Sequence, residues 1–229
     1  CYSGCRQYRE NLIKAREEVG PDAPIVEKVR MGFNHPDFVK TMAEHVGDAI
    51  TELGIKPGEA NVYFTAHSIP LSMADHCDYV KQLTESARLV AEASGVQDWR
   101  LVFQSRSGPP QQKWLEPDIC DAIEEAHDAG RLEHLVIVPI GFVSDHMEVM
   151  YDLDDEAAEL CKERSIPMRR AATAGLHQSF LTMIRKLVEE RLGRPQDKEA
   201  VGGLGAWHDV CPADCCQYKP QRPPARVPG

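Results

Sequence analysis

Apolar residues follow two alternating patterns along this chain. Between residues 36 and 53 they recur every three or four positions, which predicts a helix with one buried face. Residues 61–66 form a short apolar run instead, which predicts a buried strand. Further helices are expected at about 74–93, 118–129 and 178–192 and over the acidic segment after residue 146, with strands at about 100–104, 134–140 and 167–172. This alternation predicts an α/β fold in which helices cover both faces of a mostly parallel sheet.

The two ends of the chain are less regular. Residues 2–9 are typical of a loop that leads into a helix, which Gly20 and Pro21 end, and a short strand is expected at about 24–29. After Gly205 the chain is rich in proline, and we expect this tail to be ordered only where something anchors it. Because the first residue is Cys1 rather than Met, we interpret the sequence as a fragment of a longer protein.

The composition limits the class of protein. Of the 229 residues, 42% are hydrophobic and 27% are charged, which is ordinary for a soluble globular protein. The formal net charge of −10 argues against a general affinity for nucleic acid or anionic lipid and favours small cations as partners. No run of about 18 apolar residues is present, so neither a transmembrane helix nor a secretory leader is expected. These features favour a cytoplasmic monomer.

His67 is the first candidate for chemistry. It follows the apolar run at 61–66, so its imidazole is expected at the carboxyl end of a strand, where open α/β sheets build their sites. An imidazole can accept a proton near neutral pH or bind a metal ion. A histidine that is simply hydrogen-bonded within a loop is an equal alternative. His146 and Glu148, which follow the strand that ends at Ile140, favour the functional interpretation.

A row of acids follows the same strand. Glu148, Asp152 and Glu156 recur every four residues, so their carboxylates are expected on roughly one face of a helix. Acids near a helix N-terminus are often merely solvated, because the helix dipole favours them there. Here apolar neighbours narrow the polar stripe, and half-buried acids can hold metal ions or pass protons.

The third candidate, Arg106, follows the strand expected at about 100–104. Arg106 can bind a ligand carboxylate through two hydrogen bonds. A structural turn built on Gly108 and Pro109 explains this segment equally well.

Four segments together make the sequence resemble the ferrochelatase family, most closely the bacterial enzymes that insert iron into coproporphyrin. They are residues 2–8, 65–70, 104–110 and 141–152, of which the last two are the most specific. The resemblance extends to about Gly193. It implies two Rossmann-like, chelatase-like domains with a porphyrin cleft between them, one domain being complete here and the other partial.

The resemblance also implies a division of the chain. Residues 36–174 would form the C-terminal chelatase domain, and residues 1–35 with 175–205 would be a remnant of the N-terminal domain. Residues 206–229 would be a tail rich in cysteine and proline. The absent part of the first domain supplies one wall of the cleft in this family, so this piece alone is expected to be inactive or poorly folded.

The family's reaction inserts ferrous iron into a porphyrin while two pyrrole nitrogens lose their protons, a step of heme biosynthesis. The resemblance assigns His67 as proton acceptor and metal ligand, with Glu148 as its partner across the macrocycle. Asp152 and Glu156 would continue an acidic path, along which the ion moves by exchanging oxygen ligands.

The porphyrin is expected to contact Tyr8, Ser68 and Arg106. No organic cofactor is expected. The sequence does not distinguish coproporphyrin III from protoporphyrin as the substrate, and the choice of coproporphyrin III is inherited from the likeness to actinobacterial sequences.

Eight cysteines add a separate feature. Cys211, Cys215 and Cys216 are close together in the tail, and in a reducing compartment close-set thiols favour metal binding over a disulfide. Ferrochelatases that carry a two-iron two-sulfur (2Fe-2S) cluster use one internal cysteine as well, which implies Cys5, with Cys1 as the close alternative. Zinc suits four thiolates equally well, and an unligated tail is the third possibility. The other three cysteines fall in predicted helices and are expected to be ordinary core or surface residues.

Two other classes of function remain open from the sequence. One is a related chelatase that inserts another metal into another tetrapyrrole. The other is a non-enzymatic iron–sulfur or metal-sensing module, in which only the cysteine tail matters.

Overall fold

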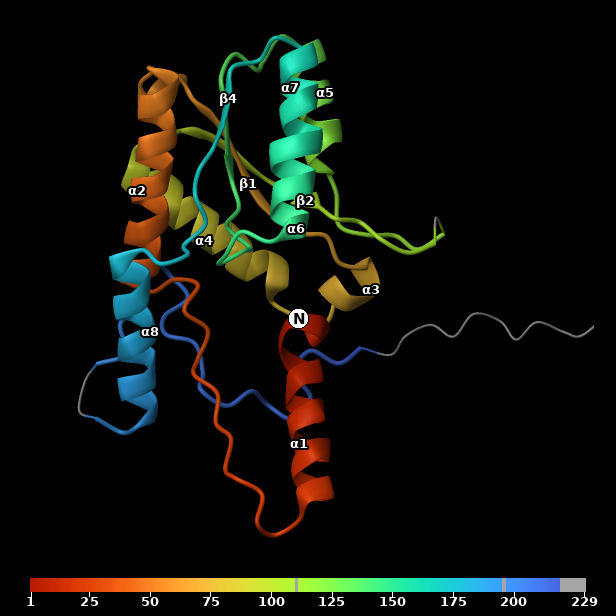
Figure 1. Cartoon of the computed structure of the whole chain (residues 1–229), viewed down its shortest axis with the longest axis vertical. Coiled ribbons are helices and arrows are strands. Elements are labelled where there is room, and N and C mark those ends of the chain that lie inside the picture. Colours follow the sequence, from red (N-terminus) through yellow and green to blue (C-terminus); the bar gives the residue numbers. More distant parts are fainter. Residues whose placement is uncertain (110, 195–196, 219–229) are drawn as a thin grey trace, which may run out of the picture.

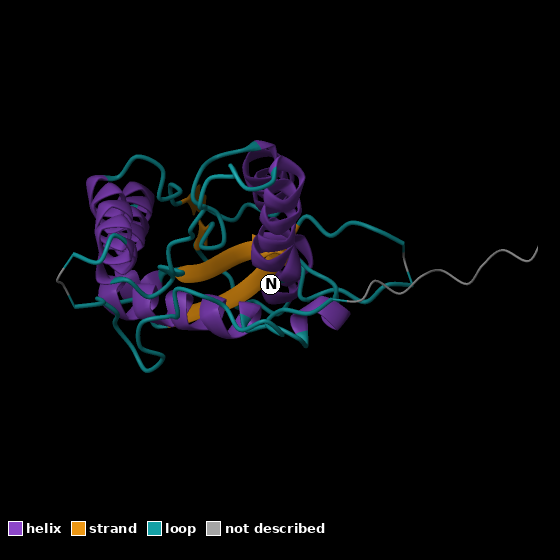
Figure 2. Ribbon diagram, turned by 90° about the horizontal axis from the view of Figure 1, so that it is seen from below, coloured by secondary structure: helices purple, strands orange, loops and turns teal. Residues whose placement is uncertain are grey.

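The computed structural model describes residues 1–109, 111–194 and 197–218. Within these residues, a four-stranded parallel sheet lies at the centre with helices on both faces (Figures 1 and 2). The strands are β1 (Asn61–His67), β2 (Asp98–Gln104), β3 (Leu135–Val138) and β4 (Met168–Arg170), in the order β2-β1-β3-β4. The predicted α/β fold with a parallel sheet is therefore confirmed.

Side chains of β1 alternate between two apolar cores. Val62 and Phe64 belong to one core, whereas Tyr63 between them belongs to the other. The first core is covered by α2 (Pro36–Leu53), α4 (Tyr79–Ser94) and α8 (Gln178–Arg191), and the second by α5 (Ile119–Asp128) and α7 (Ala157–Glu163). Because successive side chains of a strand point to opposite faces, a strand buried on both faces needs the uninterrupted apolar run seen in the sequence.

Two predicted helices are interrupted in the structure. The helix expected at about 74–93 is divided into a single turn, α3 (Leu71–Ala74), and α4, which begins at Tyr79. The acidic helix starts as α6 (Met147–Val149), widens into the π-helix η3 (Met150–Glu156) and continues as α7. A π-helix is rare and often marks a functional site, and apolar periodicity does not reveal it.

The prediction of a strand at about 24–29 is wrong. Residues 21–35, all of them described, contain no strand, and Ile25 is 81% exposed. The helix before this segment, α1 (Gln7–Val19), has no buried residue and stands apart from the sheet (Figure 1). It follows a short π-helical turn, η1 (Tyr2–Arg6). The apolar residues of 24–29 thus have no neighbouring strand with which to pair.

The C-terminal tail is ordered where other segments hold it. The backbone N–H of Val201 donates to the carbonyl of Asn34 (2.9 Å), and the ring of Trp207 packs edge-on against Phe33. This agrees with the expectation of an anchored tail, although the proline-rich residues 220–224 lie outside the described residues. In the described part of the chain, no helix combines the length and apolarity needed to cross a membrane.

Candidate functional site

β1 and β2 end side by side and carry the first two groups of the site. His67 is paired with Gln104 in the sheet register, and the backbone N–H of Ser68 donates to the carbonyl of Gln104 (2.8 Å). The imidazole and the amide therefore emerge at the carboxyl edge of the sheet. This is where the sequence predicted His67 to lie.

The ring of His67 is oriented by its own loop. Its Nδ1 is hydrogen-bonded to the backbone carbonyl of Ser68. Since a carbonyl oxygen only accepts, Nδ1 carries the proton, and Nε2 has the free lone pair of the neutral ring. The hydroxyl of Tyr79 donates to the backbone carbonyl of His67 (3.0 Å) and so ties this strand end to α4. The side chain of His67 remains 35% exposed and is accessible to a ligand.

Glu148 lies opposite the free nitrogen of this ring. Its Oε1 is 3.8 Å from Nε2 of His67. The loop between β3 and α6 approaches β1 closely at Gly141, where an added Cβ would lie 2.7 Å from the Cβ of Ala66. The structure thus brings together the two residues that the resemblance paired.

Asp152 is held by the end of β2. Its Oδ2 accepts hydrogen bonds from Nε2 of Gln104 (3.2 Å) and from the hydroxyl of Ser105. Gln104 is only 1% exposed, and the same nitrogen also reaches the backbone carbonyl of Glu148 (3.2 Å). One buried amide therefore fixes the second acid and the helical turn that carries the first.

The acidic row is more exposed than the sequence predicted. The side chain of Glu148 is 51% exposed and Glu156 is also exposed, whereas Asp152 is partly buried. The negative charge of Glu156, together with a hydrogen bond, raises the pKa of the Tyr151 phenol. The prediction of half-buried acids is wrong for Glu148 and Glu156, because the helix turns its apolar positions inward and these two carboxylates outward.

Exposed apolar side chains flank the His67–Glu148 pair. Val143 in the preceding loop is 53% exposed, and Met147 and Met150 are 74% and 50% exposed. Large apolar side chains beside convergent polar groups are typical of a ligand-binding surface.

The three residues expected to contact a porphyrin have different environments. Ser68 is buried, and its hydroxyl donates to the backbone carbonyl of Leu115 (2.9 Å), so this hydroxyl stabilises the loop. Arg106 is exposed, and Tyr8 on α1 is 62% exposed. Pro110, at the end of the same segment as Arg106, lies outside the described residues.

The tail cysteines lie next to Cys5. Sγ of Cys5 is 4.0 Å from Sγ of Cys211, and the thiols of Cys215 and Cys216 are 3.2 Å apart. Cys1 contacts a neighbouring serine (3.4 Å). The proximity to Cys211 favours Cys5 over Cys1 as the internal ligand of a metal group.

Cations surround these thiols. Nζ of Lys28 donates to Sγ of Cys5 (3.0 Å). Burial opposes ionisation of Cys5, but Lys28, together with a hydrogen bond from Cys211 and the positive N-terminus, outweighs it and lowers the pKa of the thiol. Arg6 and Arg9 donate to backbone carbonyls of the cysteine segment (2.8 and 3.2 Å). Arg6 and Arg9 thus anchor the tail, and Lys28 favours the thiolate, the form that binds metals.

The remaining cysteines are ordinary thiols, as expected. Burial raises the pKa of Cys120 to about 12 and that of Cys161 to about 11, and it also raises the pKa of Cys77. Cys161 packs in the second core.

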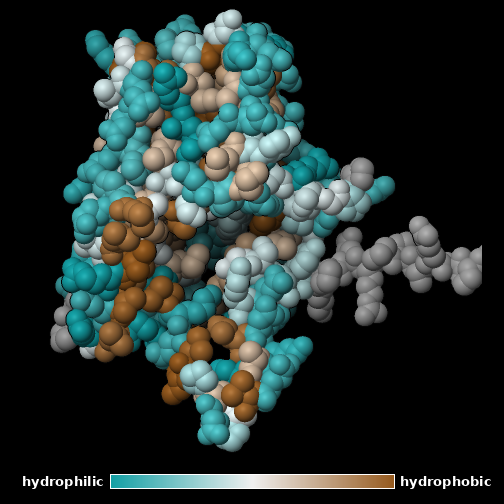
Figure 3. All heavy atoms as spheres, viewed as in Figure 1, coloured by the Kyte–Doolittle hydropathy of each residue, from teal (hydrophilic) through white to brown (hydrophobic). Residues whose placement is uncertain are grey.

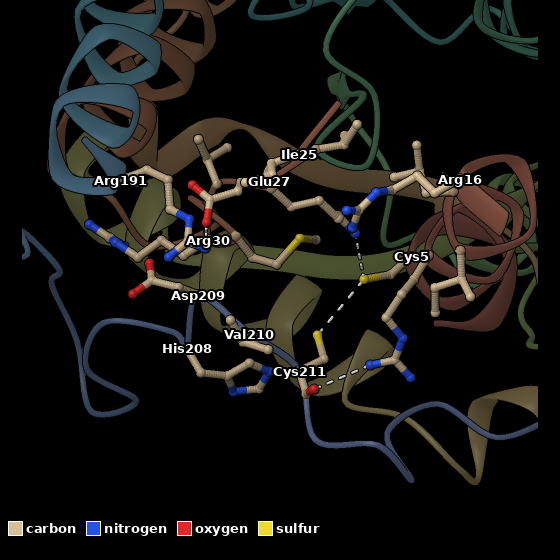
Figure 4. A pocket seen from close by; sticks show the side chains of 17 residues that line it. Cys5, Arg16, Ile25, Glu27, Arg30, Arg191, His208, Asp209, Val210 and Cys211 are labelled. Carbon is tan, nitrogen blue, oxygen red and sulfur yellow. Dashed lines mark hydrogen bonds and ion pairs between the residues drawn. The ribbon is translucent and has the colours of Figure 1, made fainter. Parts of the chain in front are cut away.

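Sequence reasoning missed a cavity of about 350 Å³ beside the thiols (Figure 4). Its walls come from α1, from residues 25–31 and from the tail, so no local pattern predicts it. His208 lines this cavity, and one of its ring nitrogens and the Sγ atoms of Cys211 and Cys215 lie within 4.8 Å of one another. The sequence contained a hint, because a histidine shortly before clustered cysteines is a common metal-ligand spacing.

A second group of possible ligands already has a cation. His35, Asp37 and Glu199 offer donor atoms within 4.8 Å of one another. The ammonium of Lys186 lies 2.9 Å from a carboxylate oxygen of both Asp37 and Glu199. The lysine supplies the positive charge that these acids need.

The chain was compared with known proteins. Residues 1–192 match the family model Ferrochelatase. A ferrochelatase of Rhodopirellula baltica is 66% identical over 98% of this chain and 64% of its own length, and a coproporphyrin III ferrochelatase of Streptomyces coelicolor is 47% identical over 98% and 66%. A crystal structure of a putative cobalamin (vitamin B12) biosynthesis CbiX protein from Marinobacter aquaeolei is 20% identical and covers 59% of this chain and 99% of its own, with a TM-score of 0.43.

The chain spans about two thirds of the length of the curated relatives it matches. The matched region includes the strand ends and the acidic helix that form the site. The chain therefore belongs to the ferrochelatase family.

Proposed function

We propose that the protein containing this chain inserts ferrous iron into a porphyrin with release of two protons, as a step of heme biosynthesis. The observation that carries the proposal is the approach of Nε2 of His67 to Oε1 of Glu148 (3.8 Å) at the carboxyl edge of the sheet. Coproporphyrin III is the favoured substrate, supported by the name of the Streptomyces coelicolor relative.

His67 is suited to accept a pyrrole proton. Its Nδ1 proton is engaged by a backbone carbonyl, so the lone pair of Nε2 faces the open side of the site. The carboxylate of Glu148 stabilises the imidazolium that forms and can receive the proton in turn. Together the two groups remove protons from the ring and offer one nitrogen and one oxygen ligand to the entering ion.

The acids after Glu148 are suited to deliver the ion. Carboxylate oxygens bind ferrous iron weakly enough to exchange it. Asp152 is fixed in place by Gln104 and Ser105, whereas the exposed Glu156 can meet a hydrated ion. The exposed Met147 and its apolar neighbours offer contacts to the flat face of a macrocycle.

We further propose that the tail binds a 2Fe-2S cluster through Cys5, Cys211, Cys215 and Cys216. The donor set fits, because Cys5 contacts Cys211, Cys215 contacts Cys216, and a lysine favours the thiolate of Cys5. Such a cluster supplies one-electron redox chemistry when it is bound. Zinc held by the same thiols is the alternative that metal analysis would reveal.

We also propose that residues 36–174 form one chelatase domain and that residues 1–35 and 175–205 belong to a second, in a cytoplasmic monomer. Exposed apolar side chains support a second domain. They gather over α8 and around residues 25–31 (Figure 3), and Ile184 and Val188 are each 43% exposed. Such surfaces are normally covered by further protein.

The test measures metal insertion by a protein that contains this chain and has the full length of its relatives. Coproporphyrin III and protoporphyrin are each supplied with ferrous iron, cobalt or nickel, and iron with coproporphyrin III should react fastest. His67→Ala should lower kcat by about 10²–10⁴. His76→Ala, an exposed histidine hydrogen-bonded only to its own turn, is the matched control and should leave kcat unchanged. Undiminished turnover by His67→Ala would refute the catalytic assignment, and a preference for another metal would favour a different tetrapyrrole chelatase.

A further inference from the structure

The helical turn that carries Glu148 is short and is packed on one side. α6 spans Met147–Val149, and its N-cap residue, His146, makes no side-chain cap hydrogen bond to a described residue. The π-helix η3 follows directly. Val149 and Leu153 are fully buried and anchor the apolar side of the turn, whereas the side chain of Glu148 is 51% exposed. The position of this carboxylate therefore depends on what holds the polar side.

Arg170 contacts the chain on both sides of this turn. It is the last residue of β4, and its Nε and Nη2 donate to the two carboxylate oxygens of Asp154 in η3 (2.6 and 3.0 Å). Its Nη1 donates to Oδ1 of Asp145 in the loop before α6 (3.1 Å) and to the backbone carbonyl of Ala171 (3.3 Å). Because Asp145 precedes Glu148 and Asp154 follows it, one guanidinium connects the two ends of the segment that carries Glu148.

The chemistry of this contact suits a tether. The side chain of Arg170 is only 17% exposed, and its two-pronged contact with a carboxylate matches the planar geometry of a guanidinium. Burial opposes the charge, but the hydrogen bonds and charges of Asp154 and Asp145 outweigh it and raise the pKa of Arg170. All three guanidinium nitrogens already have protein acceptors. Arg170 is therefore placed to hold segments of the protein together rather than to bind substrate.

Gln104 holds the same segment from the other edge of the sheet. The strand order is β2-β1-β3-β4, so Gln104 at the end of β2 and Arg170 at the end of β4 lie on the two edge strands. Nε2 of Gln104 donates to the backbone carbonyl of Glu148 and to Asp152 (3.2 Å each). His67 ends β1, which lies between these two strands. The acidic segment is thus tied to both edges of the sheet, with Glu148 near the imidazole between them.

From this geometry we propose that Arg170 is a positioning residue for iron insertion. By tying the two flanking aspartates together, it holds Glu148 opposite Nε2 of His67. The inference rests on the proposed function, because it names the residue that fixes one member of the catalytic pair. A misplacement of about 1 Å can cost about 10²-fold in rate, so loss of this tether should slow the reaction without removing a group that meets substrate.

The experiment uses a protein that contains this chain and has the full length of its relatives. Arg170→Gln removes the charge and the two-pronged contact. It should lower kcat at least about tenfold and change the KM for the porphyrin less than about threefold. Arg170→Lys keeps the charge but cannot match both aspartates at once, so its kcat should lie between those of Arg170→Gln and the unsubstituted protein.

Arg169→Gln is the matched control. Arg169 is the preceding residue of β4, and its side chain points to the opposite face of the sheet. Its Nε lies 3.4 Å from a carboxylate oxygen of Glu52 in α2, and the two side chains are 51% and 66% exposed. Loss of this exposed pair should leave kcat unchanged.

Removal of Glu148 separates positioning from a general loss of stability. If Arg170 acts through Glu148, Arg170→Gln should slow a protein that already carries Glu148→Gln by no more than about twofold. A merely structural defect would lower kcat by the same factor with and without Glu148. Asp154→Asn breaks the same contact from its other side, and it should reproduce the loss of kcat even where Arg170→Gln does not fold.

Hydrogen–deuterium exchange tests the tether without catalysis. The amides of residues 143–156 should exchange severalfold faster in Arg170→Gln and Asp154→Asn than in Arg169→Gln. The proposal is overturned if this exchange is unchanged, if both tether variants retain full kcat, or if the loss is the same with and without Glu148. A protein that inserts no iron but shows the faster exchange would refute the proposed function and leave Arg170 as the tether of this segment.

Discussion

Oε1 of Glu148 lies 3.8 Å from Nε2 of His67, although His67 ends β1 and Glu148 lies in α6, after β3. The order of the sheet explains this contact. β3 lies directly beside β1, so the loops after the two strands leave the same edge next to each other. The pair is therefore a consequence of the topology, and its chemistry depends on both members.

Because the two groups act together, the rate reductions caused by removing each of them should not multiply in the double variant. His67→Ala and Glu148→Gln are each expected to lower iron insertion by about 10²-fold or more, and the double variant should be little slower than the worse single variant. Steady-state rates are measured for the unsubstituted full-length protein, the two single variants and the double variant, which together form a double-mutant cycle. Losses that multiply would show that the two residues act independently.

Tyr79→Phe should slow iron insertion without removing any group that meets substrate. The lost hydroxyl leaves the partly buried carbonyl of His67 without its donor from α4, which should cost about 1 kcal/mol of unfolding free energy. Tyr63→Phe is the matched control, since its hydroxyl donates to the carbonyl of Ala122 (3.3 Å) in the core on the other face of the sheet. Both variants should be less stable, but only Tyr79→Phe should lower kcat. Equal activities would place Tyr79 among purely structural residues.

Local patterns predicted the sheet and the position of His67 well. The uninterrupted run at β1 identified a strand buried on both faces, and the position of His67 after it was enough to place the imidazole at the site. Periodicity failed where hydrogen bonding decides the backbone, as in the π-helix η3. It also failed at residues 24–29, which lack a partner strand.

Contacts between distant segments were beyond sequence reasoning. The approach of Lys28 to Cys5 and of Arg6 to the carbonyl of Cys215 joins three segments that share no pattern. The exposure of Glu148 depends in the same way on which side of its helix the core occupies.

A buried ion pair fastens the segment after α1 to α8. Arg30 donates two hydrogen bonds to Glu190 (2.7 and 2.9 Å), and the two side chains are only 1% and 3% exposed. Glu190→Ala leaves a buried guanidinium without its counter-ion and should lower the unfolding free energy by about 3–5 kcal/mol.

Urea unfolding of the variants measures this loss. Glu18→Ala breaks the exposed pair with Lys14 (3.9 Å), whose side chains are 69% and 78% exposed, and should change stability by less than about 0.5 kcal/mol. Similar midpoints for Glu190→Ala and Glu18→Ala would mean that the buried pair contributes little.

His35 should make the protein less stable in mild acid. Burial lowers the pKa of this imidazole, and its Nδ1 accepts a hydrogen bond from the N–H of Asp37 at the start of α2 (3.1 Å). The unfolded chain therefore binds a proton more readily than the folded one. Stability is complete above about pH 6.5 and falls as the pH drops toward the lowered folded value, by at most about 1.4 kcal/mol per pH unit for this one group.

His35→Asn keeps a helix-capping side chain but cannot titrate, so its unfolding free energy should depend less on pH between about 5 and 7. His45, whose pKa is also lowered by burial, contributes in the same direction and remains in the variant. Identical pH profiles for the variant and the unsubstituted protein would assign the acid sensitivity to other groups.

Lys28 should control the reactivity of Cys5 in the metal-free protein. Burial opposes ionisation of Cys5, but the ammonium of Lys28, with help from Cys211 and the N-terminus, lowers the pKa of the thiol, so Cys5 should be alkylated faster than an ordinary cysteine at pH 7. Lys28→Met removes the charge but keeps an apolar stem, and it should slow alkylation of Cys5 severalfold. Lys28→Arg should preserve the rate.

Peptide mass spectrometry after timed exposure to iodoacetamide follows each thiol separately, and Cys120, with its pKa raised to about 12, serves as the unreactive reference in the same sample. If Cys5 reacts no faster than Cys120, or if Lys28→Met leaves its rate unchanged, the lysine does not stabilise the thiolate, and metal binding at Cys5 would have to displace a proton without its help.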